Sequence, residues 1–84
     1  MTINISVIIP CFNEIDTISK IIDLIIGNEN FKAEIIAVDD FSTDGSREIL
    51  NDLLNNNKIT HLILNDKNFG KGYSIRQGIE KATN

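Results

Sequence analysis

Three short polar clusters in this sequence each follow an apolar run. They are Cys-Phe-Asn-Glu at 11–14, Asp-Asp-Phe-Ser at 39–42 and Asn-Phe-Gly-Lys-Gly at 68–72. An aromatic ring such as that of Phe12 can lie against a flat base, and a carboxylate such as that of Asp40 can accept a hydrogen bond from a base N–H or a ribose hydroxyl. Lys71 can neutralise a phosphate. If the fold brings these clusters together, they have the chemistry of a nucleotide site.

Each of these residues also has a purely structural interpretation. Phe12 can belong to the core, and Asn13 can cap the helix that follows it. Asp39 and Asp40 are adjacent at a strand end, so their side chains point to opposite sides and at most one faces a ligand. The other can close a turn or cap a helix. Lys71, at the start of a helix, can simply be solvated.

Several other kinds of site are disfavoured by the spacing of residues. Residues 70–75 carry the first two glycines of the dinucleotide fingerprint but not the third, and no G-x-x-x-x-G-K-[ST] phosphate loop is present. His61 has no cysteine or histidine at ligand spacing, so we expect a structural histidine. Cys11 has no base placed to activate it, so we expect a packed thiol.

Apolar runs predict three strands. They lie at 5–9, where Pro10 stops the run, at 35–38 and, more weakly, at 61–64. The first two runs are predicted to be strands buried on both faces, because they are almost entirely apolar. The first two polar clusters lie at the ends of their runs, and the third follows its run after Asn65, Asp66 and Lys67.

Apolar residues three and four positions apart predict the helices between these strands. The first helix covers 15–26, with Asn13 as its N-cap and Asp16 in its first turn. Apolar residues within 49–54 mark the second helix, and a last helix after the glycines at 70 and 72 carries its apolar residues within 75–82 inward. The positions expected to form the apolar faces of the first and last helices are Ile15, Ile18, Ile21, Ile22, Leu24, Ile25, Ile26, Ile75, Ile79 and Ala82.

The resulting order, β-α-β-α-β-α with short connections, predicts an α/β fold with a parallel three-stranded sheet and helices on its faces. In such a sheet ligands bind beyond the carboxyl ends of the strands, where the three polar clusters lie. Because the chain stops directly after a helix, we expect residues 1–84 to be the N-terminal part of one larger domain. An unpaired edge of the first strand would then favour self-association.

Composition limits the partners and the compartment. Twelve acidic and eight basic residues give a net charge of −4, without a lysine or arginine cluster, so we expect no nucleic-acid binding. The sequence shows neither a signal peptide nor an apolar run of roughly 18 residues. The single cysteine makes no internal disulfide. We therefore expect a cytoplasmic location.

Taken together, the stretches 6–14, 34–46 and 68–72 closely resemble the opening of family 2 glycosyltransferases. The resemblance covers nearly the whole chain and is nearest to the branch with dolichyl-phosphate mannose and glucose synthases. It implies a Rossmann-like GT-A fold and an inverting enzyme of cell wall or polysaccharide biosynthesis. The implied donor is a UDP- or GDP-sugar, and the implied acceptor is a lipid phosphate or a saccharide.

The resemblance also implies a set of nucleotide-binding residues: Pro10, Phe12, Glu14, Val38, Asp40 and Lys71. In this set Val38 contributes backbone beside the base, Asp40 hydrogen-bonds the base or ribose, and Lys71 is the weaker candidate. Phe12 stands where tyrosine is common in the family. Phe41 stands where glycine is usual, and its bulk is expected beside the pocket.

The resemblance places the Asp-x-Asp motif that holds Mg²⁺ or Mn²⁺, and the catalytic base, beyond Asn84. We therefore expect residues 1–84 alone to be inactive and to hold no metal, and the longer enzyme to act at the cytoplasmic face of a membrane. One alternative remains open, a self-contained, non-catalytic α/β nucleotide-binding or interaction module. A phospho-acceptor receiver domain is disfavoured because the acidic pair follows the second strand.

Overall fold

A computed structural model describes residues 3–84 of the chain. The elements, in chain order, are β1 (Ile3–Cys11), α1 (Ile18–Ile26), β2 (Phe31–Asp39), α2 (Ser46–Asn55), β3 (His61–Leu64) and α3 (Lys71–Lys81). Within the described residues, no helix combines the length and apolar character that a membrane crossing requires.

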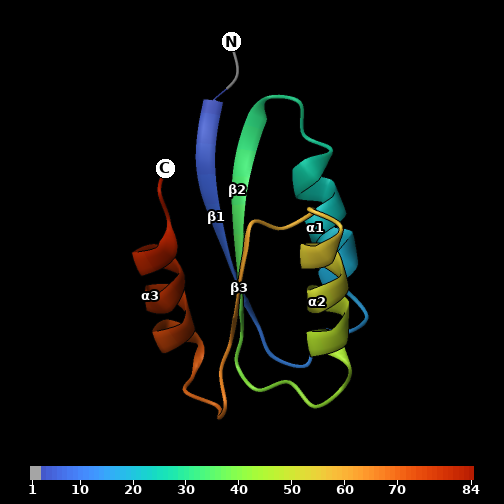
Figure 1. The fold of residues 1–84 in the computed structure, drawn as a ribbon, viewed down its shortest axis with the longest axis vertical. Helices are drawn as coiled ribbons and strands as arrows, with labels where there is room; N and C mark the ends of the chain where they lie inside the picture. The colour runs from blue at the N-terminus through green and yellow to red at the C-terminus, as the bar shows by residue number, and fades with distance from the viewer. Residues whose placement is uncertain (1–2) are drawn as a thin grey trace.

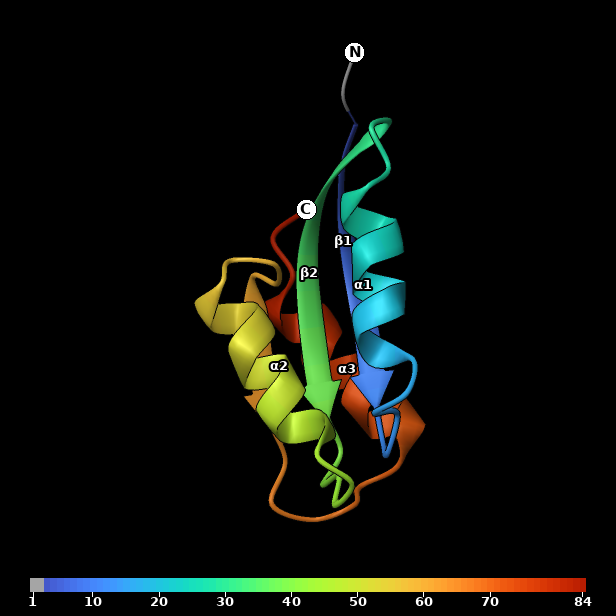
Figure 2. The same cartoon turned by 90° about the vertical axis from the view of Figure 1, so that its right-hand side faces the viewer.

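The three strands form one parallel sheet in the order β1-β2-β3. Helices α1 and α2 cover one face of this sheet and α3 covers the other (Figure 1). Figure 2 shows α1 and α2 side by side in front of the strands. The predicted α/β class, element order and parallel sheet are confirmed.

The boundaries of the first two strands differ from the prediction. β1 does not stop at Pro10 but continues to Cys11, and β2 begins at Phe31, four residues before the predicted start. In the described residues β1 pairs only with β2. Proline is tolerated in such a strand because its missing N–H can face the unpaired side. Most of β1 is only half-buried, so the prediction of a strand buried on both faces was wrong.

The predicted start of the first helix was also wrong. Helix α1 begins at Ile18 with Thr17 at the N-cap, and no acidic residue lies in its first turn. Asn13 has φ 53°, a left-handed conformation, and sits in a loop that precedes the helix. The loop is held by contacts to residues 42–46, described below, and these override the local helical pattern.

The main core lies between the sheet and the helices α1 and α2. Its buried members are Ile9, Cys11, Ile18, Ile22, Ile35, Ala37, Leu50, Leu53 and Ile59. The apolar stripe of α1 is narrower than predicted, because Ile21, Leu24 and Ile26 are exposed. On α3 the inward prediction for Ile79 was wrong as well, since its side chain is 56% exposed.

Helix α3 packs on the opposite face through small residues. Ser74 and Gly78 are its buried positions. A Cβ added at Gly78 would lie 2.4 Å from Cγ2 of Ile8 on β1, so the helix approaches the sheet more closely than any side chain would permit. The close approach brings the N-terminus of α3 beside the carboxyl end of β1.

A cluster around Glu34 ties the chain after α3 to the amino-terminal half of the sheet. The Glu34 carboxylate accepts hydrogen bonds from Thr83 N at 2.8 Å, Thr83 Oγ1 at 2.7 Å and Ser6 Oγ at 2.8 Å. His61 Nε2 lies 3.7 Å from the same carboxylate, which agrees with a structural histidine. The bonds from Thr83, followed by that from Ser6, lower the pKa of Glu34 from 4.5 to about 2.

This lowered pKa gives an expected pH dependence. Because Glu34 is ionised more readily in the folded state, its contribution to stability is complete above pH 4.5 and is lost as the pH falls towards about 2. Glu34→Gln should therefore reduce the loss of stability between about pH 6 and about pH 3. Urea unfolding of both proteins at the two pH values measures this. An equal loss in both proteins would contradict the assignment.

Candidate functional site

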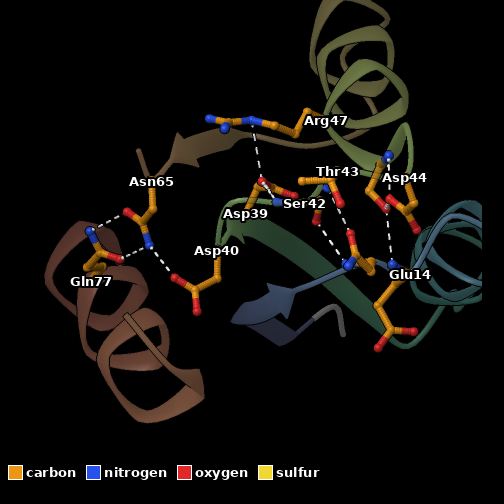
Figure 3. Close-up of polar contacts among 11 residues, drawn as sticks. Glu14, Asp39, Asp40, Ser42, Thr43, Asp44, Arg47, Asn65 and Gln77 are labelled. Carbon is orange, nitrogen blue, oxygen red and sulfur yellow. Dashed lines mark hydrogen bonds and ion pairs between the residues drawn. The ribbon is translucent and has the colours of Figure 1, made fainter. Parts of the chain in front are cut away.

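Asp39 and Asp40 point to opposite sides of the sheet end, as their adjacent positions predict (Figure 3). Asp39 faces α2, where its Oδ2 accepts the Ser42 N–H at 2.9 Å and lies 3.4 Å from Arg47 Nε. The turn-closing interpretation is therefore correct for Asp39. Asp40 lies on the side of α3.

The Asp40 carboxylate organises the loop that leads into α3. Its Oδ1 accepts hydrogen bonds from Phe69 N at 2.8 Å and Asn65 Nδ2 at 3.1 Å, and its Oδ2 accepts one from Gly70 N at 2.8 Å. Burial alone would raise the pKa of Asp40, but these hydrogen bonds together outweigh it and lower the pKa. Asp40 is therefore a fixed, ionised acceptor beside the helix N-terminus.

A hollow of about 260 Å³ lies between the end of β1 and the start of α3. Its lining residues are Pro10, Cys11, Phe12, Glu14, Asp40, Asn68, Gly70, Lys71 and Ser74. Pockets for drug-sized ligands measure roughly 300–1,000 Å³. The hollow is thus of a size to take part of a nucleotide, such as its nucleoside.

The hollow unites five of the six sequence-predicted site residues, all except Val38. The Val38 side chain is fully buried and lines no part of it, although Val38 pairs in register with Pro10. Phe12 is 46% exposed, so the interpretation of Phe12 as a core residue was wrong. The role of each of these residues in binding a nucleotide stays a prediction.

Hydrogen bonds between the loops after β1 and β2 position Phe12 and Glu14. The backbone N–H groups of Asn13, Glu14 and Ile15 donate to Ser42 Oγ at 2.9 Å, Ser46 Oγ at 3.0 Å and Asp44 Oδ2 at 3.1 Å. In return, Thr43 N donates to the side-chain Oδ1 of Asn13 at 2.8 Å. Asn13 therefore bridges two loops instead of capping a helix.

Cys11 borders the hollow but is not activated. Its side chain is 1% exposed, and burial, followed by the negative charge of Asp39, raises the pKa of the thiol. A raised pKa keeps the sulfur protonated and unreactive. The structure thus agrees with a packed thiol.

The sequence matches the profile described as Glycosyl transferase family 2 over residues 6–84. The chain belongs to glycosyl transferase family 2. Its relatives include poly-beta-1,6-N-acetyl-D-glucosamine synthases of Staphylococcus aureus, 32% identical over 79 residues, and of Staphylococcus epidermidis, 30% identical over 79 residues. Each alignment covers 94% of this chain and 19% of the relative, so the chain spans about a fifth of the length of these proteins.

Solved structures confirm the GT-A fold. A mannosyltransferase from Pyrobaculum calidifontis, in complex with GDP-Man and Mn²⁺, superposes with a TM-score of 0.82 at 24% identity, covering 93% of this chain and 24% of that one. S. aureus TarS superposes with a TM-score of 0.80 at 24% identity, covering 96% of this chain and 24% of that one. At this level of identity the likeness concerns the fold.

Phe41 has a backbone conformation that favours glycine. Its φ is 69°, in the left-handed region that a bulky side chain rarely occupies. Glycine adopts this conformation without a Cβ penalty. Phe41 is 42% exposed and is not among the residues that line the hollow, contrary to the expectation that its bulk lies beside the pocket.

The residues of this family 2 chain do not fit a divalent metal ion. Among residues 3–84, no three histidine, cysteine, aspartate or glutamate side chains come together as metal ligands. The Asp40 oxygens accept backbone and amide N–H groups, and Asp39 is paired with Arg47.

Sequence reasoning missed three residues beside the Asp40 carboxylate. Asn65 is 5% exposed and directly follows β3, so the rule that selected the residues after the other two strands also points to it. Ser74 and Gln77 lie three positions apart on α3. Ser74 lines the hollow, and its buried hydroxyl has no hydrogen-bond partner in the described residues. The signal in the sequence that could have identified Ser74 and Gln77 was a polar face on the helix that follows the third strand.

Proposed function

We propose that this chain forms the nucleotide-binding part of a glycosyltransferase that uses a UDP- or GDP-sugar. The observation that carries the proposal is the hollow at the carboxyl ends of the strands, where the exposed Phe12 ring and the fixed Asp40 carboxylate line one space. In open α/β sheets ligands bind beyond the carboxyl ends of the strands, which is where this hollow lies.

Each lining group has a separate task in this proposal. The Phe12 ring stacks on the base, and Asp40 accepts a hydrogen bond from the base or ribose. Pro10, Glu14 and the backbone near Val38 shape the nucleoside pocket. Lys71, at the first turn of α3, faces the phosphates from the rim. The N-terminal dipole of α3 is already matched by the Asp40 carboxylate, which favours the nucleoside in the hollow over the phosphates.

The complete enzyme transfers the sugar with inversion to a lipid phosphate or a saccharide. The acceptor oxygen bonds to the anomeric carbon as the bond to the nucleoside diphosphate breaks, and a carboxylate outside this chain takes the acceptor proton. The 84 residues alone are inactive in this proposal, because Mg²⁺ or Mn²⁺ and the base need other parts of the protein. The enzyme works in the cytoplasm, at the membrane face.

Self-association of the isolated chain is a further part of the proposal. Within the described residues, β1 has a paired strand only on the side of β2, so one long edge of the sheet has no strand partner. Such an edge can pair with another strand. A second copy of the chain is the proposed occupant.

Titration of UDP and GDP into the chain tests the nucleotide site. Phe12→Ala should weaken binding by about tenfold or more, because stacking of a base on an aromatic ring contributes roughly 1–3 kcal/mol. Phe41→Ala is the matched control: Phe41 is 42% exposed, Phe12 is 46% exposed, and only Phe12 lines the hollow. Isothermal titration calorimetry gives both affinities.

Two outcomes would contradict the proposal. If neither nucleotide binds the chain, with or without Mn²⁺, the nucleotide site is refuted and the interaction-module alternative gains support. If Phe41→Ala lowers the affinity as much as Phe12→Ala, binding does not occur in the hollow.

A further inference from the structure

We propose that Asn65 and Gln77 are positioning residues that hold the Asp40 carboxylate in place for the nucleotide, an inference that rests on the proposed function. Their amides form a reciprocal pair, in which Asn65 Nδ2 donates to Gln77 Oε1 and Gln77 Nε2 donates to Asn65 Oδ1, both at 2.9 Å. Asn65 Nδ2 also donates to Asp40 Oδ1 at 3.1 Å. Figure 3 shows this chain of contacts from α3 to the end of β2.

The charge of Asp40 determines how both amides are oriented. An ionised carboxylate only accepts hydrogen bonds, so the NH₂ group of Asn65, and not its oxygen, must face Asp40. Gln77 then presents its oxygen to that NH₂ group and its own NH₂ group to Asn65 Oδ1. Asn65 is 5% exposed, and its backbone N–H donates to Asp39 O at 2.9 Å, so the side chain is anchored at its base.

The pair also determines what Asp40 can offer to a ligand. A carboxylate has about four acceptor positions. Asn65 and Phe69 use two on Oδ1, and Gly70 uses one on Oδ2. The described residues show no second hydrogen bond to Oδ2, although the Ser74 hydroxyl also helps to lower the pKa of Asp40, so Oδ2 keeps acceptor capacity for a ligand donor. Without the amide pair, Oδ1 keeps only its bond from Phe69 N and the carboxylate is held by two backbone N–H groups alone, so the direction of its remaining acceptor position is less firmly fixed.

Gln77→Glu tests this role with little change in size. The new carboxyl group places an oxygen opposite Asn65 Oδ1, where the Nε2 donor stood. At about pH 7.5 the affinity for UDP or GDP should fall about tenfold. At about pH 4 a carboxyl with the ordinary pKa of about 4.3 is mostly protonated and can donate to Asn65 Oδ1, so the affinity should recover in part. Asp40 stays ionised there because its pKa is lowered.

Two further variants separate positioning from general stability. Gln77→Ala should lose the same affinity without recovery at low pH, because it supplies no donor. Glu80→Gln is the control: Glu80 lines the same shallow surface pocket as Tyr73, Arg76 and Gln77, and it makes no hydrogen bond to either amide. Its affinity should match the wild type at both pH values.

The outcomes distinguish this inference from the proposed function. If Gln77→Glu and Gln77→Ala bind within twofold of the wild type while Phe12→Ala is weakened, the positioning role is refuted and the nucleotide site stands. If the wild type binds neither nucleotide, the proposed function is refuted. NMR titration of the Asp40 carboxyl carbon then tests whether the amide pair holds Asp40. A higher Asp40 pKa in Gln77→Ala than in Glu80→Gln supports the contact chain, and equal values overturn it.

Discussion

Replacing Arg47 with methionine should destabilise the domain by about 3 kcal/mol, because it leaves a buried carboxylate without its cation. Asp39 is 0% exposed, and Arg47 Nε lies 3.4 Å from its Oδ2. The other oxygen, Oδ1, is buried without a hydrogen-bond partner in the described residues, so only the Ser42 N–H, 2.9 Å from Oδ2, would remain to stabilise the charge. Small domains have only about 5–15 kcal/mol of stability in total, so this is a large fraction. Urea unfolding measures it.

An exposed ion pair of the same chain provides the matched control. Lys58 Nζ lies 3.6 Å from Asp23 Oδ1, with side chains 48% and 61% exposed. Lys58→Met should cost less than about 1 kcal/mol, because exposed ion pairs contribute little. Adding Asp39→Asn to Arg47→Met should recover most of the lost stability, since it removes the buried charge. If Arg47→Met and Lys58→Met have equal effects, Asp39 does not depend on Arg47.

Replacing Gly78 with alanine should destabilise the domain by about 2 kcal/mol through overpacking. The added Cβ would lie 2.4 Å from Cγ2 and 3.1 Å from Cγ1 of Ile8, so α3 must move away from the sheet. The movement also carries Lys71 and Ser74 away from the hollow. Nucleotide affinity should therefore fall together with stability, as urea unfolding and calorimetric titration can show.

Gly72→Ala is the control within the same helix. Nothing lies within 4 Å of a Cβ added at Gly72, so this change should be neutral or stabilising by up to about 1 kcal/mol, as alanine favours helix. The double variant with Gly78→Ala and Ile8→Ala should lose less stability than the two single variants together. The reason is that Ile8→Ala removes the side-chain atoms with which the added Cβ would clash. If the two losses of stability simply add, the clash with Ile8 is not the cause of the loss in Gly78→Ala.

Much of the site could be predicted from local patterns. Apolar runs and helical spacing predicted the element order, and the carboxyl-end rule then selected the loops that contain Phe12 and Asp40. The opposite directions of Asp39 and Asp40 followed from the two-residue period of a strand. These predictions succeeded because each depends on neighbours in the chain.

Other features depended on partners far along the chain. The helical pattern from Ile15 failed because Asp44 and Ser46 hold the N–H groups of residues 14 and 15 in a loop. The prediction that Ile79 lies in the core was wrong, because the contact of Gly78 with Ile8 determines which side of α3 faces the sheet. Neither partner can be read from local spacing.

The sequence by itself determined the fold class, the family and five of the residues beside the hollow, because strand and helix periods and short motifs are local properties. Only the tertiary structure decided how these residues are held. The Asp40 carboxylate meets Phe69, Gly70 and Asn65 across 25 to 30 positions of the chain. Such contacts form only when the strands align and α3 docks on the sheet, so the direction and free acceptor position of Asp40 are properties of the folded protein.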